Sequence, residues 1–145
     1  MMKKRLFAAV TAVAMVAGTF VGASSAQAAD RNVTVWSPYK GDNLKMWDAA
    51  LARIEKANPG LKIKSVGSVD MAKSLAAINA GNGPDISVAN GAGNLGWFCG
   101  TGAWQRLNTY VAGSNGINMK STFTPSANAY TVSSNNRCGL PAVGS

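Results

Sequence analysis

Residues 32–66 carry the strongest indication of the fold and read NVTVWSPYKGDNLKMWDAALARIEKANPGLKIKSV. The first five residues are rich in β-branched and aromatic side chains, which is typical of a β-strand. Apolar residues then recur at helical spacing from Leu44 to Ile54 and predict an amphipathic helix, which the Asn58-Pro59-Gly60 segment ends. Residues 61–66 alternate between apolar and polar and predict a second strand with one face in water. The stretch therefore predicts a strand–helix–strand unit.

The alternation of strands and helices continues toward the C-terminus. Ser68 or Asp70 is expected to open a second helix, which the Gly81-Asn82-Gly83-Pro84 segment ends. The remaining predicted elements are a strand over residues 85–89, a glycine-rich loop over 90–93, helical turns over 94–99 and 103–111, a short helix over 125–134 and a strand over 137–140. This order predicts an α/β fold with an open, mostly parallel sheet and flanking helices.

The N-terminus has the three parts of a Sec signal peptide. Basic residues lie within Met1–Arg5, an apolar stretch runs from Leu6 to Val21, and small residues stand at Ala26 and Ala28. The apolar stretch is short for a membrane span, so we expect cleavage after Ala28 rather than a membrane anchor. Residues 29–145 then carry 11 basic and 6 acidic side chains, a net charge of +5 in place of +8 for the whole chain.

The two cysteines, Cys99 and Cys138, both follow the predicted signal peptide. Two cysteines in an exported chain predict one disulfide, which here closes a loop spanning 39 positions. Two free buried thiols, or pairing with another chain, are the alternatives. Two cysteines without histidine supply too few ligands for a metal site, so none is expected.

Composition argues against an enzyme. The chain has no histidine, which removes histidine-based triads and general acid–base catalysis. No Asp or Glu follows Asp85, a residue expected to be structural because it stands at the start of a strand. Asp48 and Glu55 lie off the apolar stripe of the first helix and are expected to face water. We therefore expect no catalytic residues.

Nucleotide and nucleic-acid binding are also disfavoured. Gly91-x-Gly93-x-x-Gly96 matches the dinucleotide fingerprint, but the acidic residue that would bind the ribose about 20 positions later is absent. The lysines are dispersed along the chain rather than clustered, which argues against a nucleic-acid partner. We expect no cofactor.

The loops that follow the predicted strands carry candidate ligand contacts. Ligands of open parallel sheets bind beyond the carboxyl ends of the strands. Trp36, Tyr39, Asn90 and Asn94 lie at or near the starts of these loops. Aromatic faces stack on sugar rings and amides bind hydroxyl groups, so these residues suit a small-molecule site. Trp36 has an alternative role, in which it closes the end of the sheet.

The run from Val33 to Pro141 resembles the family-1 extracellular solute-binding proteins, which serve sugar importers of the ABC class. The segments that carry the resemblance are Val33-Thr34-Val35-Trp36, residues 54–63, Leu75-Ala76-Ala77-Ile78-Asn79-Ala80-Gly81 with Gly83-Pro84-Asp85-Ile86, residues 102–107, and Arg137-Cys138-Gly139-Leu140-Pro141. The segment over 75–86 is the most specific, and the order of all five segments strengthens the match.

The resemblance implies a monomeric, non-catalytic receptor that captures a sugar or oligosaccharide and delivers it to the permease subunits of the transporter. Members of the family have two α/β lobes that close on the ligand. Residues 29–145 would be the N-terminal lobe, with the fold of type II periplasmic binding proteins. The ligand contacts carried over from the family are Trp36, Ser37, Tyr39, Asn90 and Gly91, with Asn94 as a further candidate.

This chain differs from the family in length, because the members are more than twice as long. We therefore expect a fragment without the second lobe, with an exposed sheet edge beside the strand at Leu140 and with weak or no sugar binding. A secreted carbohydrate-active enzyme and a stand-alone exported interaction domain are the alternative hypotheses. No cysteine near the cleavage site offers a lipid anchor, which favours the periplasm.

Overall fold

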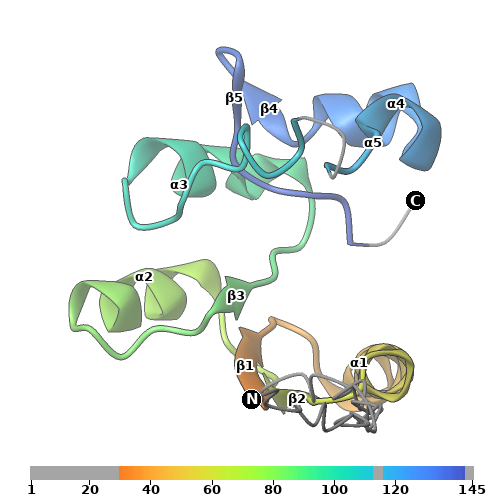
Figure 1. Cartoon of the computed structure of the whole chain (residues 1–145). Helices are drawn as coiled ribbons and strands as arrows, with labels where there is room; N and C mark the ends of the chain where they lie inside the picture. The colour runs from red at the N-terminus through yellow and green to blue at the C-terminus, as the bar shows by residue number, and fades with distance from the viewer. Residues whose placement is uncertain (1–29, 113–115, 143–145) are drawn as a thin grey trace, which may run out of the picture.

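The computed structural model describes residues 30–112 and 116–142, so the signal peptide predicted for residues 1–28 lies outside the described part. Strands β1 (Arg31–Trp36), β2 (Leu61–Val66) and β3 (Ile86–Ser87) form a parallel sheet in the order β2-β1-β3 (Figure 1). β1 pairs with β2 along its whole length and with β3 at its last two residues. The predicted α/β fold with a parallel sheet is thus confirmed.

Helices α1 (Gly41–Ala57) and α2 (Met71–Asn79) connect the three strands. Because β1 lies between β2 and β3, the two connections cross the sheet in opposite directions. Right-handed crossovers of this kind place their helices on opposite faces, and Figure 1 shows α1 and α2 on opposite sides of the sheet. The Asp70 carboxylate accepts a hydrogen bond from the Lys73 backbone N–H at 2.7 Å, which confirms Asp70 as the start of α2.

The core lies between the sheet and α1. Val35, Leu51 and Val88 are buried, and the side chains that pack against them are Val33, Tyr39, Trp47 and Ile63. The apolar stripe predicted for α1 is therefore right at its centre and wrong at its end, because Ile54 is 47% exposed. None of the helices in residues 30–112 and 116–142 has the length and apolar character to cross a membrane.

Two carboxylates fix the strands in place. Asp85 accepts hydrogen bonds from the backbone N–H and the hydroxyl of Thr34, both at 2.7 Å, while the Asp85 N–H donates to the Thr34 hydroxyl at 3.0 Å. These bonds tie the start of β3 to β1, so the predicted structural role of Asp85 is confirmed. Glu55 accepts a hydrogen bond from the Ile63 backbone N–H at 2.6 Å. The expectation that Glu55 simply faces water is thus wrong, since it joins α1 to β2.

The C-terminal half (residues 92–142) contains short elements only. They are η1 (Ala92–Asn94), α3 (Leu95–Gly100), α4 (Met119–Thr122), α5 (Pro125–Ala129), β4 (Val132–Ser133) and β5 (Asn136–Arg137). The helix predicted over 103–111 is absent, and those residues form bends and turns. The helix predicted over 125–134 stops at Ala129, because the chain then turns into the antiparallel β4–β5 hairpin.

The hairpin also corrects the prediction of a strand over residues 137–140. Ser134 and Asn135 have φ values of 48° and 65°, which fits the tight two-residue turn that joins hairpin strands. β5 therefore pairs with β4 and does not return to the main sheet, and Leu140 lies in no strand. The main sheet instead has free edges at β2 and β3, since no strand of the described residues pairs on the outer side of either, and Ile86 of β3 is 49% exposed.

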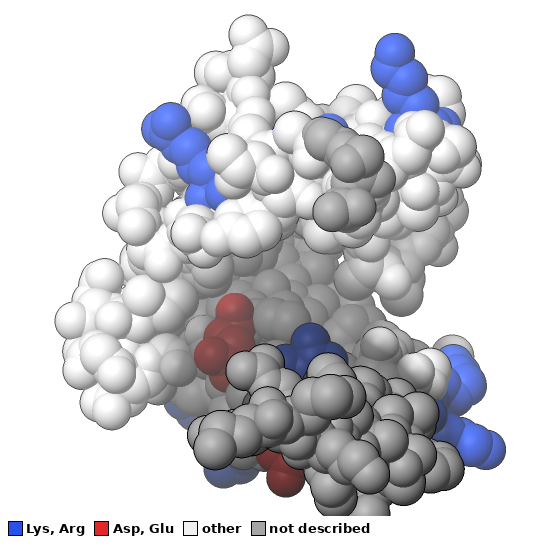
Figure 2. All heavy atoms as spheres, in the orientation of Figure 1, with Lys and Arg blue, Asp and Glu red and all other residues white. Residues whose placement is uncertain are grey.

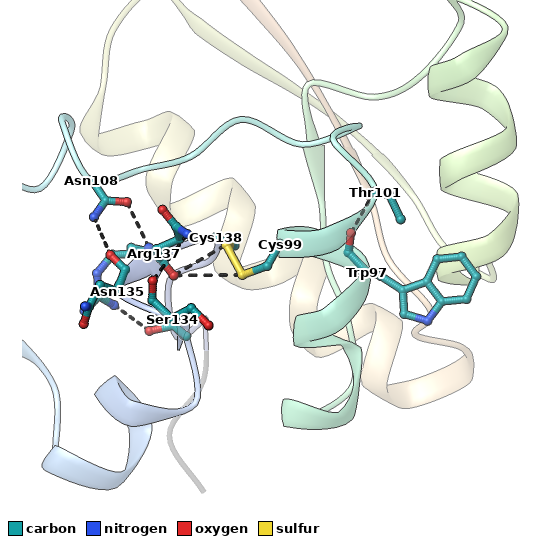
Figure 3. The surroundings of a disulfide bond; sticks show 10 residues. Trp97, Cys99, Thr101, Asn108, Ser134, Asn135, Arg137 and Cys138 are labelled. Atoms are coloured by element: carbon teal, nitrogen blue, oxygen red, sulfur yellow. Dashed lines mark hydrogen bonds between the residues drawn. A yellow bond between two sulfur atoms is a disulfide. The ribbon is translucent and has the colours of Figure 1, made fainter.

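Cys99 and Cys138 form a disulfide with their Cα atoms 5.3 Å apart, which confirms the predicted pairing (Figure 3). Asn108 adds two hydrogen bonds, since it accepts from the Arg137 N–H at 2.9 Å and donates to the Asn135 carbonyl at 3.0 Å. Among the described residues of the C-terminal half, Cys138 is the one apolar residue that is buried. This half therefore depends on cross-links more than on an apolar core.

Loss of the disulfide is expected to destabilise the chain strongly. The Cys99→Ala/Cys138→Ala double variant frees a loop of 39 residues, which chain-entropy arguments convert to about 3–4 kcal/mol of unfolding free energy. Urea denaturation of the oxidised protein and of the double variant measures this difference. Reductant should lower the stability of the parent chain and leave that of the variant unchanged. A loss below about 1 kcal/mol would contradict the dependence on cross-links.

Acid is expected to weaken the contact between β1 and β3. Hydrogen bonds from the Thr34 N–H and hydroxyl hold the pKa of the Asp85 carboxyl below its ordinary value. The carboxylate therefore stabilises the fold above its unfolded-state pKa of roughly 3.9, and this stabilisation is lost as the pH falls through the lower folded-state pKa. Asp85→Asn should lower the unfolding free energy at neutral pH, and the difference should disappear in strong acid. Asp48→Asn, at an exposed position of α1, is the control and should show no such pH dependence.

Candidate functional site

The carboxyl ends of β1 and β3 form the edge at which a ligand site is expected. The two strands are neighbours, and the Val88 N–H donates to the Trp36 carbonyl at 2.8 Å, so their ends lie side by side. The connections that follow the two strands then separate, because β1 leads into α1 and β3 leads into the C-terminal half (Figure 1). Adjacent strands whose connections diverge form a topological switch point, where open α/β sheets bind their ligands.

The loop after β1 carries three of the predicted contacts. Trp36 is half-buried at the strand end. Ser37 has no exposed surface, and its backbone bonds to Val66 and Val69 at 2.9 Å on each side. In this conformation Ser37 therefore supports the loop, since no ligand can touch it from solvent. Tyr39 is half-buried, with its ring centroid 5.6 Å from that of Trp47 on α1.

The loop after β3 carries the other three predicted contacts. Asn90 and Gly91 are exposed, and Gly91 has a φ of 78°, a left-handed conformation that favours glycine. The Asn94 side-chain amide donates to the Asn90 carbonyl at 2.9 Å, so it closes the turn into α3. The Asn90 side chain and the Gly91 backbone are thus open to a ligand, while the Asn94 amide already has a partner.

The six predicted residues thus lie at the end of β1 or in the loops that follow the paired strands β1 and β3, and their surroundings differ. Trp36 and Tyr39 offer parts of two aromatic faces, and Asn90 and Gly91 offer exposed polar groups. Such a mixture can stack on a ring and bind hydroxyl groups, and it offers no charged side chain of its own. Asp85 stands at the opposite, amino end of β3, away from this edge.

Two hollows lie elsewhere in the molecule. One, of about 510 Å³, is open to solvent and is bordered by α4, α5 and the β4–β5 hairpin, with Lys120 and Arg137 in its lining. The other, of about 350 Å³, lies between the Ile78–Asp85 segment and residues 103–105. Neither includes any of the six predicted contacts. Neither Lys120 nor Arg137 was predicted as a site residue from the sequence, although both fall in the stretch after Asp85 that has no acidic residue.

Comparison of the sequence with protein-family models gives no match, and comparison with curated proteins gives none either. The function proposed below is therefore inferred from the sheet edge and the sequence resemblance.

The position of the Tyr39 loop is expected to depend on Gly67. A Cβ atom at residue 67 would collide with the Leu44 side chain and lie 2.9 Å from the Tyr39 carbonyl oxygen. Gly67→Ala should therefore displace this loop and lower the unfolding free energy by about 1–3 kcal/mol in urea denaturation. Gly96→Ala is the control, because a Cβ there meets no atom within 4 Å. Equal stability of the two variants would show that the loop does not need this close approach.

Proposed function

We propose that residues 29–145 form the N-terminal lobe of the sugar-binding component of an ABC importer, with the type II periplasmic-binding-protein fold. The observation that supports this proposal most is the strand order β2-β1-β3, which sets Trp36 and the Asn90–Asn94 loop at one switch point. The ligand contacts retained from the sequence resemblance are Trp36, Tyr39, Asn90 and Gly91, because Ser37 is buried and the Asn94 amide is bonded to the Asn90 carbonyl.

The exposed edge of the sheet also supports a lobe with a missing neighbour. β3 has two residues, and Ile86 is 49% exposed on it. The unpaired backbone groups on the outer edge of β3 can accept a further strand. In the proposed receptor, a strand that follows the first crossover between the lobes covers this edge.

The chemistry of the site suits a neutral, hydroxyl-rich ligand. Trp36 would stack on a sugar ring, and the Asn90 side chain and Gly91 backbone would bind hydroxyl groups. One lobe supplies only one wall of such a cleft, so closure of the second lobe would provide the remaining contacts and exclude water. The chain alone is therefore expected to bind sugar weakly or not at all.

The proposed location is the periplasm, with the permease subunits as the membrane partner and the receptor as a monomer. A disulfide is compatible with this location, because such bonds persist in oxidising compartments. The signal peptide predicted for residues 1–28 would direct export to this compartment.

Calorimetry and NMR titration of the purified chain with glucose, xylose, maltose and longer oligosaccharides test the proposal. Dissociation constants of about 1 mM or weaker are expected, with chemical-shift changes gathered at the ends of β1 and β3. Trp36→Ala should weaken any measurable binding about tenfold, because it removes the stacking face. Tyr130→Ala is the matched control, since Tyr130 is 60% exposed at the end of α5, away from the switch point.

Two results would contradict the proposal. Tight, saturable binding by the chain alone would show that no second lobe is needed. Chemical-shift changes centred away from the ends of β1 and β3 would show that the ligand binds elsewhere. The DNA beyond the codon of Ser145 gives an independent check. A continuing frame for a second α/β lobe beside permease genes supports the receptor, whereas unrelated neighbours favour a stand-alone exported domain.

A further inference from the structure

Arg137 is a buried cation whose partners in the structure are neutral. Its side chain lies on β5 with 8% of the residue exposed. Nη1 donates to the Thr131 hydroxyl at 2.5 Å, and Nη2 donates to the Asn128 side-chain oxygen at 2.6 Å. A guanidinium has five N–H donors, so donors remain for a further acceptor. Neutral oxygens orient the group without compensating its charge.

No acidic side chain of the described residues forms an ion pair with Arg137. No Asp or Glu follows Asp85, whereas Arg106, Lys120 and Arg137 all do. The one ion pair found among the described residues joins Lys45 to Asp42 on α1. On the face that Figure 2 shows, the half of the molecule formed by α3 to β5 carries basic side chains and no acidic one. A buried charge without an opposite charge is unfavourable, which makes this site receptive to an anion.

The guanidinium borders a hollow large enough for a ligand. The hollow of about 510 Å³ is lined by Arg137 and Asn128, by the exposed Lys120, and by apolar side chains that include Phe123 and Val132. Cavities of this size hold small organic molecules, and mostly apolar walls with a few polar groups are typical of such sites. The two cations supply a charged end, and the apolar residues supply a wall for a hydrocarbon group.

We propose that this hollow binds a small organic anion whose carboxylate or phosphate group is held by Arg137 and Lys120 and whose apolar part contacts Phe123 and Val132. Arginine suits this role, because its planar fork binds two oxygens of a carboxylate or phosphate at once. The site lies in the C-terminal half and uses none of the residues at the switch point, so it goes beyond the proposed sugar binding and does not depend on it.

Thermal unfolding of the full chain in the presence of benzoate, benzamide and inorganic phosphate tests this proposal. Benzoate should raise the melting temperature in a concentration-dependent way, because a ligand that binds the folded state stabilises it. Benzamide has the same ring without the charge and should bind at least tenfold more weakly. Phosphate has no apolar part to contact the wall, so it should raise the melting temperature less than benzoate does. NMR chemical-shift changes caused by benzoate should gather on α5 and the hairpin.

Matched variants locate the effect. Arg137→Met should remove the benzoate-induced rise in melting temperature, and Lys120→Met should weaken benzoate binding several-fold. Arg106→Met is the control, since Arg106 is exposed and does not line the hollow, and it should respond to benzoate as the parent chain does. If Arg137→Met does not fold, Lys120→Met decides the question. No stabilisation by benzoate or phosphate, equal binding of benzamide, or an unchanged response of Lys120→Met would overturn the proposal.

Discussion

Strand β1 organises the N-terminal half because it pairs on both of its edges. Val35 pairs with Ser65 of β2 and with Ile86 of β3. Val35 is only 2% exposed and packs in the core with Leu51 of α1. Parallel pairing on both sides requires crossovers in opposite directions, and these place α1 and α2 on opposite faces. The same arrangement creates the switch point at Trp36. A change that unpaired β1 would therefore remove the core, the sheet and the candidate site together.

The C-terminal half is organised by polar and covalent links. The Cys99–Cys138 disulfide joins α3 to the end of the hairpin, and Asn108 binds the hairpin backbone from the preceding loop (Figure 3). Arg137 joins the same hairpin to α5 through Asn128 and Thr131. The C-terminal half has few buried apolar side chains. The space between α4, α5 and the hairpin is therefore not filled by a packed core and remains an open hollow with two cations in its lining.

The elements with strong local patterns were predictable from the sequence, and those set by long-range contacts were not. The alternation in 61–66, the stripe of α1 and the cysteine pair each have local or compositional signals. The structure confirms the alternation, the disulfide and the stripe as far as Leu51. The β4–β5 hairpin was missed because Ser134 and Asn135 are a weak turn signal compared with Asn-Gly. The candidate site was predicted from the order of elements along the chain and from the family resemblance. The burial of Ser37 follows from its backbone bonds to Val66 and Val69, which no local pattern reveals.

A crystal structure of the chain soaked with an oligosaccharide would test the link between topology and function most directly. We expect a sugar ring against Trp36, with hydroxyl groups near Asn90 and Gly91, at the carboxyl ends of paired strands β1 and β3. A sugar bound elsewhere on the molecule, or a β3 strand that does not pair with β1, would contradict the assignment of this sheet edge as the ligand site.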